Sequence, residues 1–342
     1  MQLFITYPEW ITPEIIPGTP LRWYGLMYVI AFAITYYLFQ FQIRERKLSV
    51  KKDDVVNFFF ALLLGMLLGA RIIGTTVYDV TGRYLQAPWL IFWPFDDRMQ
   101  FTGFAGLSFH GGLVGIILAA VIYTRIKKID LLRWGDMLAT AVPLGYTFGR
   151  IGNFINSELW GRVTTMPWGI VFPNGEPLPV SEPWVQSVMA ETGITASGPM
   201  VNLPRHPSQL YEAFGEGILL WLIFWFIFRK KTPFRGFVMG LYLIGYGVVR
   251  FLVEYLRTPD KGLDFPLMFE PVTTTSHLHI SLINFSTGQI LSSLMIIGGV
   301  AAMFVFWLWS KRVSPEGGQV SENHLAKASP KRTNKSLRKR IK

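Results

Sequence analysis

The chain has 342 residues, of which 51% are hydrophobic and 15% are aromatic, and its formal net charge is +11. The apolar residues come in long blocks, which excludes an ordinary soluble globular protein of this length. The absence of cysteine excludes disulfides, cysteine-ligated metals and a cysteine nucleophile. No basic region precedes an apolar run at the N-terminus, so we expect no secretory signal peptide.

Seven apolar blocks follow one another along the chain, and crossing a bilayer as a helix needs about 20 such residues. The blocks are Tyr24–Phe41, Val55–Val77, Phe104–Tyr123, Trp134–Phe148, Tyr211–Phe228, Phe237–Leu256 and Gly288–Trp309. The fourth is short, and we expect its last turn to include the polar sequence that follows it. We therefore predict an all-α polytopic membrane protein with seven transmembrane helices.

Lysine and arginine gather in alternate connections between these blocks. Residues 44–52, 125–133 and 229–235, together with the tail after Trp309, hold 23 of the 33 basic residues. In a seven-span chain all four groups lie on one face, which the positive-inside rule makes cytoplasmic. The N-terminus is then outside and the C-terminus in the cytoplasm.

The chain divides into a membrane domain, residues 1–310, and a basic tail, residues 311–342, which we expect to be disordered. The longest outer segment, residues 162–210, contains eight prolines. This composition predicts a small irregular extracytoplasmic arm or head that is not a stable independent domain. Its sequence PWGIVFP, residues 167–173, is a candidate short strand.

The sequence GRIGNFINSELWGR, from Gly149 to Arg162, places polar residues at the outer end of the fourth block. A guanidinium at that depth is costly unless it meets a cavity, a counter-charge or a ligand. Arg150, Asn153 and Asn156 share one face if the helix continues, and such a face suits an anionic oxygen such as that of a phosphate. Snorkelling at a helix end explains one arginine but not the continuation to Glu158.

Further polar residues reach the same outer level in other blocks: Tyr24, Arg71, His110, Tyr246, Arg250 and Glu254. Arg71, Arg150 and Arg250 with only two nearby glutamates leave excess positive charge, which predicts an anionic ligand. Arg250 and Glu254 could instead form a self-sufficient i, i+4 ion pair. We favour a ligand role for Arg250, because Arg71 and Arg150 have no partner in this reading.

Two histidine patterns differ in how strongly they indicate a functional site. His110, in FHGGL, either transfers a proton or only bonds a neighbouring helix, and the sequence leaves both open. His277 and His279 form an isolated pair that is too weak a signal for a metal site. We expect neither a metal nor a cofactor.

Six segments resemble the prolipoprotein diacylglyceryl transferase family, in the right order and along nearly the whole chain to about Trp309. They are RWYGLMY, GARIIG, SFHGGLVG, GRIGNFINSELWGR, RHPSQLYE and LIGYGVVRFLVEYLR. The fourth is highly specific. The family motif residues correspond to Tyr24, His110, Arg150, Asn153, Glu158, Gly161, Tyr246 and Arg250.

The resemblance implies an enzyme that moves the diacylglyceryl group of phosphatidylglycerol onto the lipobox cysteine thiol of a preprolipoprotein. The product is a thioether and the leaving group is glycerol 1-phosphate, in the first step of lipoprotein maturation. The expected location is the bacterial inner membrane, with the active site toward the outer leaflet and a lateral opening for the signal-peptide helix. We expect a monomer among membrane lipids and no nucleic-acid partner.

The resemblance also suggests roles for single residues. Arg150 and Arg250 would hold the phosphate, helped by Asn153, and Glu158 would orient an arginine or a glycerol hydroxyl. His110 is the candidate base, because a thiol with a pKa near 8.5 needs help to ionise. The substrate-binding set further includes Tyr24, Arg71, Asn156, Gly161, Tyr246 and Glu254. The alternatives are a lipid or anion transporter, which needs polar access from both faces, and a lipid-binding scaffold without chemistry.

Overall fold

The computed structural model describes residues 4–19, 21–79, 82–95, 99–100, 106–258, 265–271, 278 and 281–312. The predicted basic tail beyond Arg312, together with His277 and His279, lies outside these residues.

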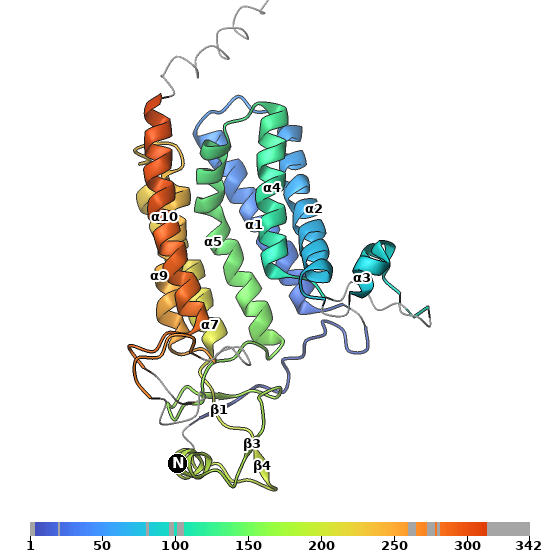
Figure 1. Ribbon diagram of the computed structural model, residues 1–342, viewed down its shortest axis with the longest axis vertical. Helices are drawn as coiled ribbons and strands as arrows, with labels where there is room; N and C mark the ends of the chain where they lie inside the picture. The colour runs from blue at the N-terminus through green and yellow to red at the C-terminus, as the bar shows by residue number, and fades with distance from the viewer. Residues whose placement is uncertain are drawn as a thin grey trace, which may run out of the picture.

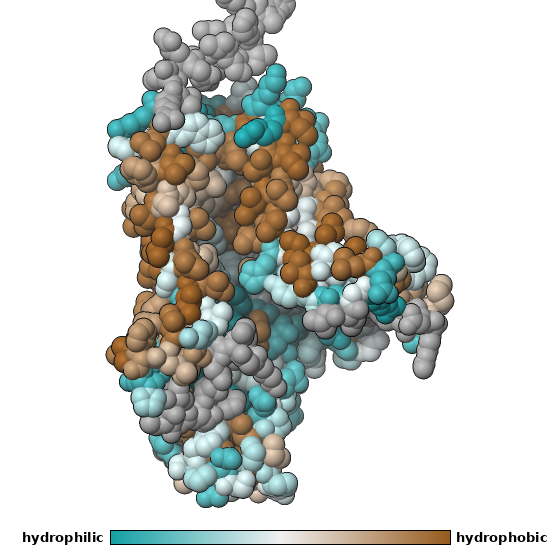
Figure 2. Space-filling model, in the orientation of Figure 1, coloured by the Kyte–Doolittle hydropathy of each residue, from teal (hydrophilic) through white to brown (hydrophobic). Residues whose placement is uncertain are grey.

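Six helices are long and apolar enough to cross a membrane. They are α1 (Trp23–Glu45), α2 (Lys52–Thr76), α4 (Phe109–Lys127), the helical run Ser208–Phe228, α9 (Phe237–Glu254) and α10 (Thr287–Arg312). Large apolar side chains cover their outer surfaces, as on α10, where Ile297 is 64% exposed. On the face seen in Figure 2 they form a broad hydrophobic surface over the bundle. Such a surface is unstable in water and suited to lipid, so the chain is a polytopic membrane protein.

A seventh long helix, α5 (Leu131–Ile155), is as long as the others but less apolar, and it contains Arg133, Asp136 and Arg150. It lies between α1 on one side and α9 and the run Ser208–Phe228 on the other (Figure 1), and about half of its residues are buried. Protein therefore surrounds much of α5, which explains its lower hydropathy. As predicted, its last turn includes part of the polar motif.

The third and fifth blocks differ from the prediction in structure. The third block was expected to begin at Phe104, outside the described residues, but α4 begins at Phe109, where the Ser108 side chain caps it by accepting from the Gly111 N–H at 3.1 Å. The fifth block is not a uniform α-helix. It consists of α7 (Ser208–Glu212), the π-helical η2 (Ala213–Leu219), α8 (Leu220–Ile223) and the π-helical η3 (Phe224–Phe228).

Short elements lie beyond the bundle. Strand β1 (Ile5–Thr6) pairs in parallel with β2 (Ile170–Val171), and β3 (Leu178–Pro179) pairs antiparallel with β4 (Met200–Val201). The remaining short helices are α3 (Arg83–Gln86), η1 (Pro88–Phe92) and α6 (Pro183–Thr192).

The predicted strand in PWGIVFP is confirmed by β2. The description of residues 162–210 as irregular is incomplete, however. Fully buried Val185 of α6 and Leu203 belong to a small hydrophobic core within this segment. Valines near the prolines supply that core, and proline composition alone did not indicate it.

The connections between the long helices lie at the two ends of the bundle. The links at 46–51, 128–130 and 230–236 and the end of α10 lie at one end (Figure 1). Strands β1, β3 and β4 lie at the other end, where they form a head. The basic residues of these described links therefore lie at the end opposite the head.

Glycines let α2 and α4 approach closely, and Gly69 tests this packing. A methyl group at Gly69 would collide with the Gly111 carbonyl oxygen and come within 2.8 Å of the Gly115 Cα atom. We expect Gly69→Ala to lower the free energy of unfolding by about 1–3 kcal/mol, because a packed backbone cannot easily move aside. Thermal unfolding in one detergent measures the effect. Gly298→Ala on α10, with nothing within 4 Å of the added methyl, is the control. Equal shifts for the two variants would contradict the prediction.

Candidate active site

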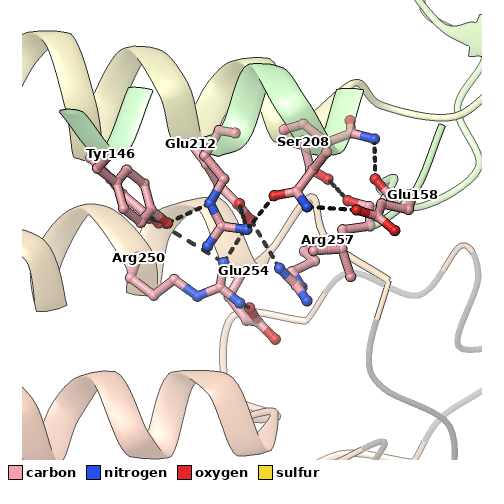
Figure 3. Close-up of polar contacts among 12 residues, drawn as sticks. Tyr146, Glu158, Ser208, Glu212, Arg250, Glu254 and Arg257 are labelled. Atoms are coloured by element: carbon pink, nitrogen blue, oxygen red, sulfur yellow. Dashed lines mark hydrogen bonds and ion pairs between the residues drawn. The ribbon is translucent and has the colours of Figure 1, made fainter. Parts of the chain in front are cut away.

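A buried carboxylate joins three arginines at the head end of the bundle. The fully buried Glu212 side chain lies 2.8 Å from Arg150 Nη1, 2.6 Å from Arg250 Nη1 and 3.1 Å from Arg257 Nη1 (Figure 3). Helices α5, α7 and α9 and the turn after α9 supply these residues. One carboxylate thus cross-links three segments that are far apart in the sequence.

A second carboxylate, Glu254, fixes the other edge of Arg250. Its Oε2 atom lies 2.8 Å from Arg250 Nη2, and its Oε1 atom accepts a hydrogen bond from the Ser286 hydroxyl at 3.1 Å. Gly288 leaves room for this carboxylate, since a methyl group there would collide with it. The i, i+4 ion pair of Arg250 and Glu254 is therefore present, but as one part of a larger network.

Tyr146 connects Arg150 to a third buried carboxylate. Arg150 Nε donates to the Tyr146 hydroxyl at 2.5 Å, and that hydroxyl donates to Glu216. The hydroxyl of Tyr246 lies 3.4 Å from that of Tyr146. Glu216 also lies 3.9 Å from Arg250 Nη1. The two arginines are thus joined through Glu212 on one side and through Tyr146 and Glu216 on the other.

Glu158 is held over the end of α5 by amides. Asn153 Nδ2 donates to its Oε1 atom at 2.8 Å and Asn156 Nδ2 donates at 3.3 Å. The φ angles of Ser157 and Leu159, +54° and +57°, are in the left-handed region, and they turn the chain so that Glu158 comes back over the helix end. The two asparagines therefore orient Glu158 here.

Tyr24 and Gly161 make close packing contacts near the end of α5. The Tyr24 ring packs over Gly152 of α5, and its hydroxyl lies 3.1 Å from that of Tyr28. Gly161 donates its N–H to the His206 carbonyl at 2.8 Å, and a methyl group at Gly161 would come within 2.8 Å of the His206 Cβ atom. Only a glycine permits this close contact between the two segments.

His206 itself does not carry charge. It is 7% exposed, and burial lowers its pKa below the ordinary value of 6.5, so it is neutral near pH 7. Its Nδ1 atom lies 3.2 Å from the Tyr211 hydroxyl, which also accepts from Trp168 Nε1 at 2.8 Å. These contacts suit His206 as an anchor of the outer segment.

The ion-paired cluster balances its charges. Its positive members are Arg150, Arg250 and Arg257, and its negative members are Glu212, Glu216 and Glu254. Our expectation of excess positive charge is therefore wrong for this cluster, because Glu212 and Glu216 were left out of the count. A buried arginine in a membrane costs about 3 kcal/mol or more, and these carboxylates offset that cost.

The arginines lie on the more open side of the cluster. Arg150 and Arg250 side chains are each 15% exposed, whereas Glu212 and Glu216 side chains are fully buried. Among the contacts of the described residues, Arg150 Nη2 and Arg250 Nε have no polar partner. These donors can bind an anion without breaking the cluster.

Arg71 and His110 have other partners. Buried Arg71 donates to the carbonyl oxygens of Ile91 at 2.5 Å and Leu90 at 3.3 Å, so it holds η1 against α2. Our premise that Arg71 and Arg150 lack partners is therefore wrong. His110 is exposed, and its Nδ1 atom lies 3.2 Å from the Tyr78 hydroxyl.

Four members of the cluster escaped the sequence analysis: Tyr146, Glu212, Glu216 and Arg257. A signal for two of them was present, since Glu212 and Glu216 are carboxylates four residues apart in an apolar helix. Charges inside a membrane helix mark functional sites by default. Tyr146 and Arg257 have no comparable local signal.

A family model described as prolipoprotein diacylglyceryl transferase matches residues 12–305. The chain belongs to this family of transferases. The expected family residues Arg150, Asn153, Tyr246 and Arg250 are all members or direct neighbours of the buried cluster.

Three relatives, all named phosphatidylglycerol–prolipoprotein diacylglyceryl transferase, match the chain at nearly full length. The relative from Treponema denticola is 45% identical over 94% of this chain and 99% of its own length. The one from Treponema pallidum is 46% identical over 93% and 100%, respectively. The one from Pseudoalteromonas atlantica is 38% identical over 95% and 99%.

Proposed function

We propose that the chain transfers the diacylglyceryl group of phosphatidylglycerol to the lipobox cysteine of preprolipoproteins. The full-length similarity to transferases of that name supports this proposal. The observation that carries it in the structure is the cluster of Arg150, Glu212 and Arg250, whose free guanidinium N–H groups lie on its open side. Such a site suits the phosphate of an anionic lipid.

In the proposed reaction, the thiolate attacks the carbon of the diacylglyceryl group that carries the phosphate ester. A C–S bond forms as the C–O bond breaks, and the electron pair leaves with glycerol 1-phosphate. Arg150 and Arg250 stabilise the negative charge on the departing phosphate. The thiol proton goes to a base, for which His110 is our candidate. Glu158, held by Asn153 and Asn156, orients the headgroup together with Tyr24 and Tyr246.

Both substrates are proposed to enter sideways from the lipid. The molecular surface is hollowed between α10 and α4, and hydrophilic residues line the lower part of this hollow (Figure 2). A lipid and a signal-peptide helix both lie in the bilayer, so such a side opening admits them without passage through water.

The proposed activity predicts a product of defined mass. Purified protein incubated with phosphatidylglycerol and a lipobox peptide should add one diacylglyceryl group to the peptide cysteine. A serine-substituted peptide should stay unmodified. A transporter or a lipid-binding scaffold would leave both peptides unchanged.

We further propose seven spans, with α5 as the fourth, in a bacterial inner membrane. The length of α5, 25 residues or about 37 Å, is sufficient. The basic end of the bundle would face the cytoplasm and the head would lie outside, with the site in the outer leaflet. The collection of basic connections at the end opposite the head supports this orientation (Figure 1).

Single cysteines test this topology, because the chain has none of its own. Ser181→Cys, exposed in the head, should react with an impermeant thiol reagent applied to the outer face of the inner membrane. Lys128→Cys, exposed in the basic link after α4, should react only after the membrane is opened. Reversed access for either variant would reject the proposed orientation.

A further inference from the structure

Glu216 is the carboxylate that arginine holds least firmly in the cluster. Glu212 has three arginine nitrogens within 3.1 Å, and Glu254 has Arg250 at 2.8 Å and a serine hydroxyl. Glu216 accepts from the Tyr146 hydroxyl, and its Oε1 atom, which accepts no hydrogen bond from the described residues, has Arg250 Nη1 only at 3.9 Å. The Oε2 atoms of Glu212 and Glu254 also accept no hydrogen bond from these residues, but each has an arginine nitrogen at 2.8 Å. A fully buried carboxylate with an unpartnered oxygen is costly in its charged form.

The backbone places this weakly held group at the centre of the site. Glu216 lies in the π-helical turn η2, directly after α7, which carries Glu212. Single π-helical turns within α-helices occur frequently at functional sites. Tyr146 connects Glu216 to Arg150, and Arg250 lies near both Glu216 and Glu212. The charge of Glu216 therefore acts on both proposed phosphate ligands.

The charge balance determines what happens when an anion binds. The free cluster has three arginines and three glutamates, so it is neutral when all are ionised. One phosphodiester adds a negative charge to a site away from bulk water, where electrostatic interactions are strong. Protonation of one carboxylate restores neutrality. Glu216 is the carboxylate that gives up the weakest arginine contacts when it is protonated.

We propose that binding of the phosphatidylglycerol phosphate at Arg150 and Arg250 is coupled to the uptake of one proton by Glu216. This inference rests on the proposed function and adds a positioning residue to it. The other groups facing Glu216 are less suited to the role. Glu212 is held by three arginines, and the neutral hydroxyls of Tyr146, Tyr242 and Tyr246 cannot gain a stable second proton.

Titration calorimetry with dihexanoyl phosphatidylglycerol measures this uptake directly. The full-length protein in detergent is titrated at one pH in two buffers of different ionisation enthalpy, and the difference in heat gives the number of protons bound. We expect about one proton per lipid for the wild-type protein, and an affinity that falls about tenfold per pH unit as the pH rises through the coupled range. Glu216→Gln should bind the lipid with no uptake and no such pH dependence. Glu191→Gln, an exposed change on α6, should behave like wild type.

The outcomes separate this inference from the proposed function. Wild-type binding without proton uptake, or uptake that persists in Glu216→Gln, would overturn the role of Glu216 and leave the transferase proposal intact. Failure of the wild-type protein to bind the lipid would overturn both. If Glu216→Gln does not fold, infrared difference spectra of the wild-type protein decide, because binding must replace a carboxylate band by that of a protonated acid. An unchanged carboxylate band would reject the inference.

Discussion

Arg150→Lys should reduce the rate of diacylglyceryl transfer by roughly 100-fold or more, with normal membrane insertion. The guanidinium uses Nε for Tyr146 and Nη1 for Glu212, which leaves Nη2 free for the phosphate. A lysine ammonium is a single point of charge and cannot meet these three directions at once. The charge would remain in the site, but the planar fork that places it would be lost. Peptide mass spectrometry with purified protein measures the rate.

Arg125→Lys is the matched control, because Arg125 is exposed in the last turn of α4 at the basic end. It should retain the wild-type rate. Arg229 is less suitable as a control, since it pairs with Glu45 at 3.0 Å and stacks over Trp225. An Arg150→Lys variant with close to full activity would reduce Arg150 to a general source of positive charge.

The helical architecture was largely predictable from the sequence, because a helix that crosses the bilayer needs a long run of mainly apolar residues. A span facing lipid must be predominantly apolar, and this requirement made the six apolar helices recognisable in the sequence. Helix α5 was harder to delimit, since neighbouring helices partly replace lipid around it and allow Asp136 and Arg150 within its length. The core around Val185 in the head was not predicted, because it depends on contacts between segments that lack a periodic pattern.

The site was predictable where its residues are close in the sequence. Asn153, Asn156 and Glu158 do meet, because one helix end and one turn place them. The counter-charge of Arg150, Glu212, is 62 residues away, and Glu216, which Tyr146 connects to Arg150, is further away still. No local spacing indicates which helix will lie beside α5. The error in the charge balance follows from this. Membrane arginines can be counted from the sequence, but their counter-charges appear only after the helices are packed.

His110→Gln should lower the transfer rate about 100-fold near pH 7 if His110 removes the thiol proton. Glutamine keeps the approximate size and a hydrogen-bonding group, but it cannot accept the proton. Raising the pH toward the pKa of the thiol, about 8.5, should restore part of the lost rate, because the nucleophile then ionises unaided. The exposure of His110 at the head end of α4 is compatible with access by a substrate thiol.

The comparison of rates near pH 7 and pH 9 separates three roles of His110. If the imidazole only forms a hydrogen bond with Tyr78, the His110→Gln variant should keep most of the transfer rate at both pH values. Tyr78→Phe should then cause the same small loss of rate as His110→Gln. An equal loss at both pH values, with unchanged protein stability, would assign His110 to the lipid headgroup. Proton removal would then pass to another residue. Tyr246 would be tested first, since its hydroxyl lies 3.4 Å from Tyr146 and thus beside the arginines that the phosphate must reach.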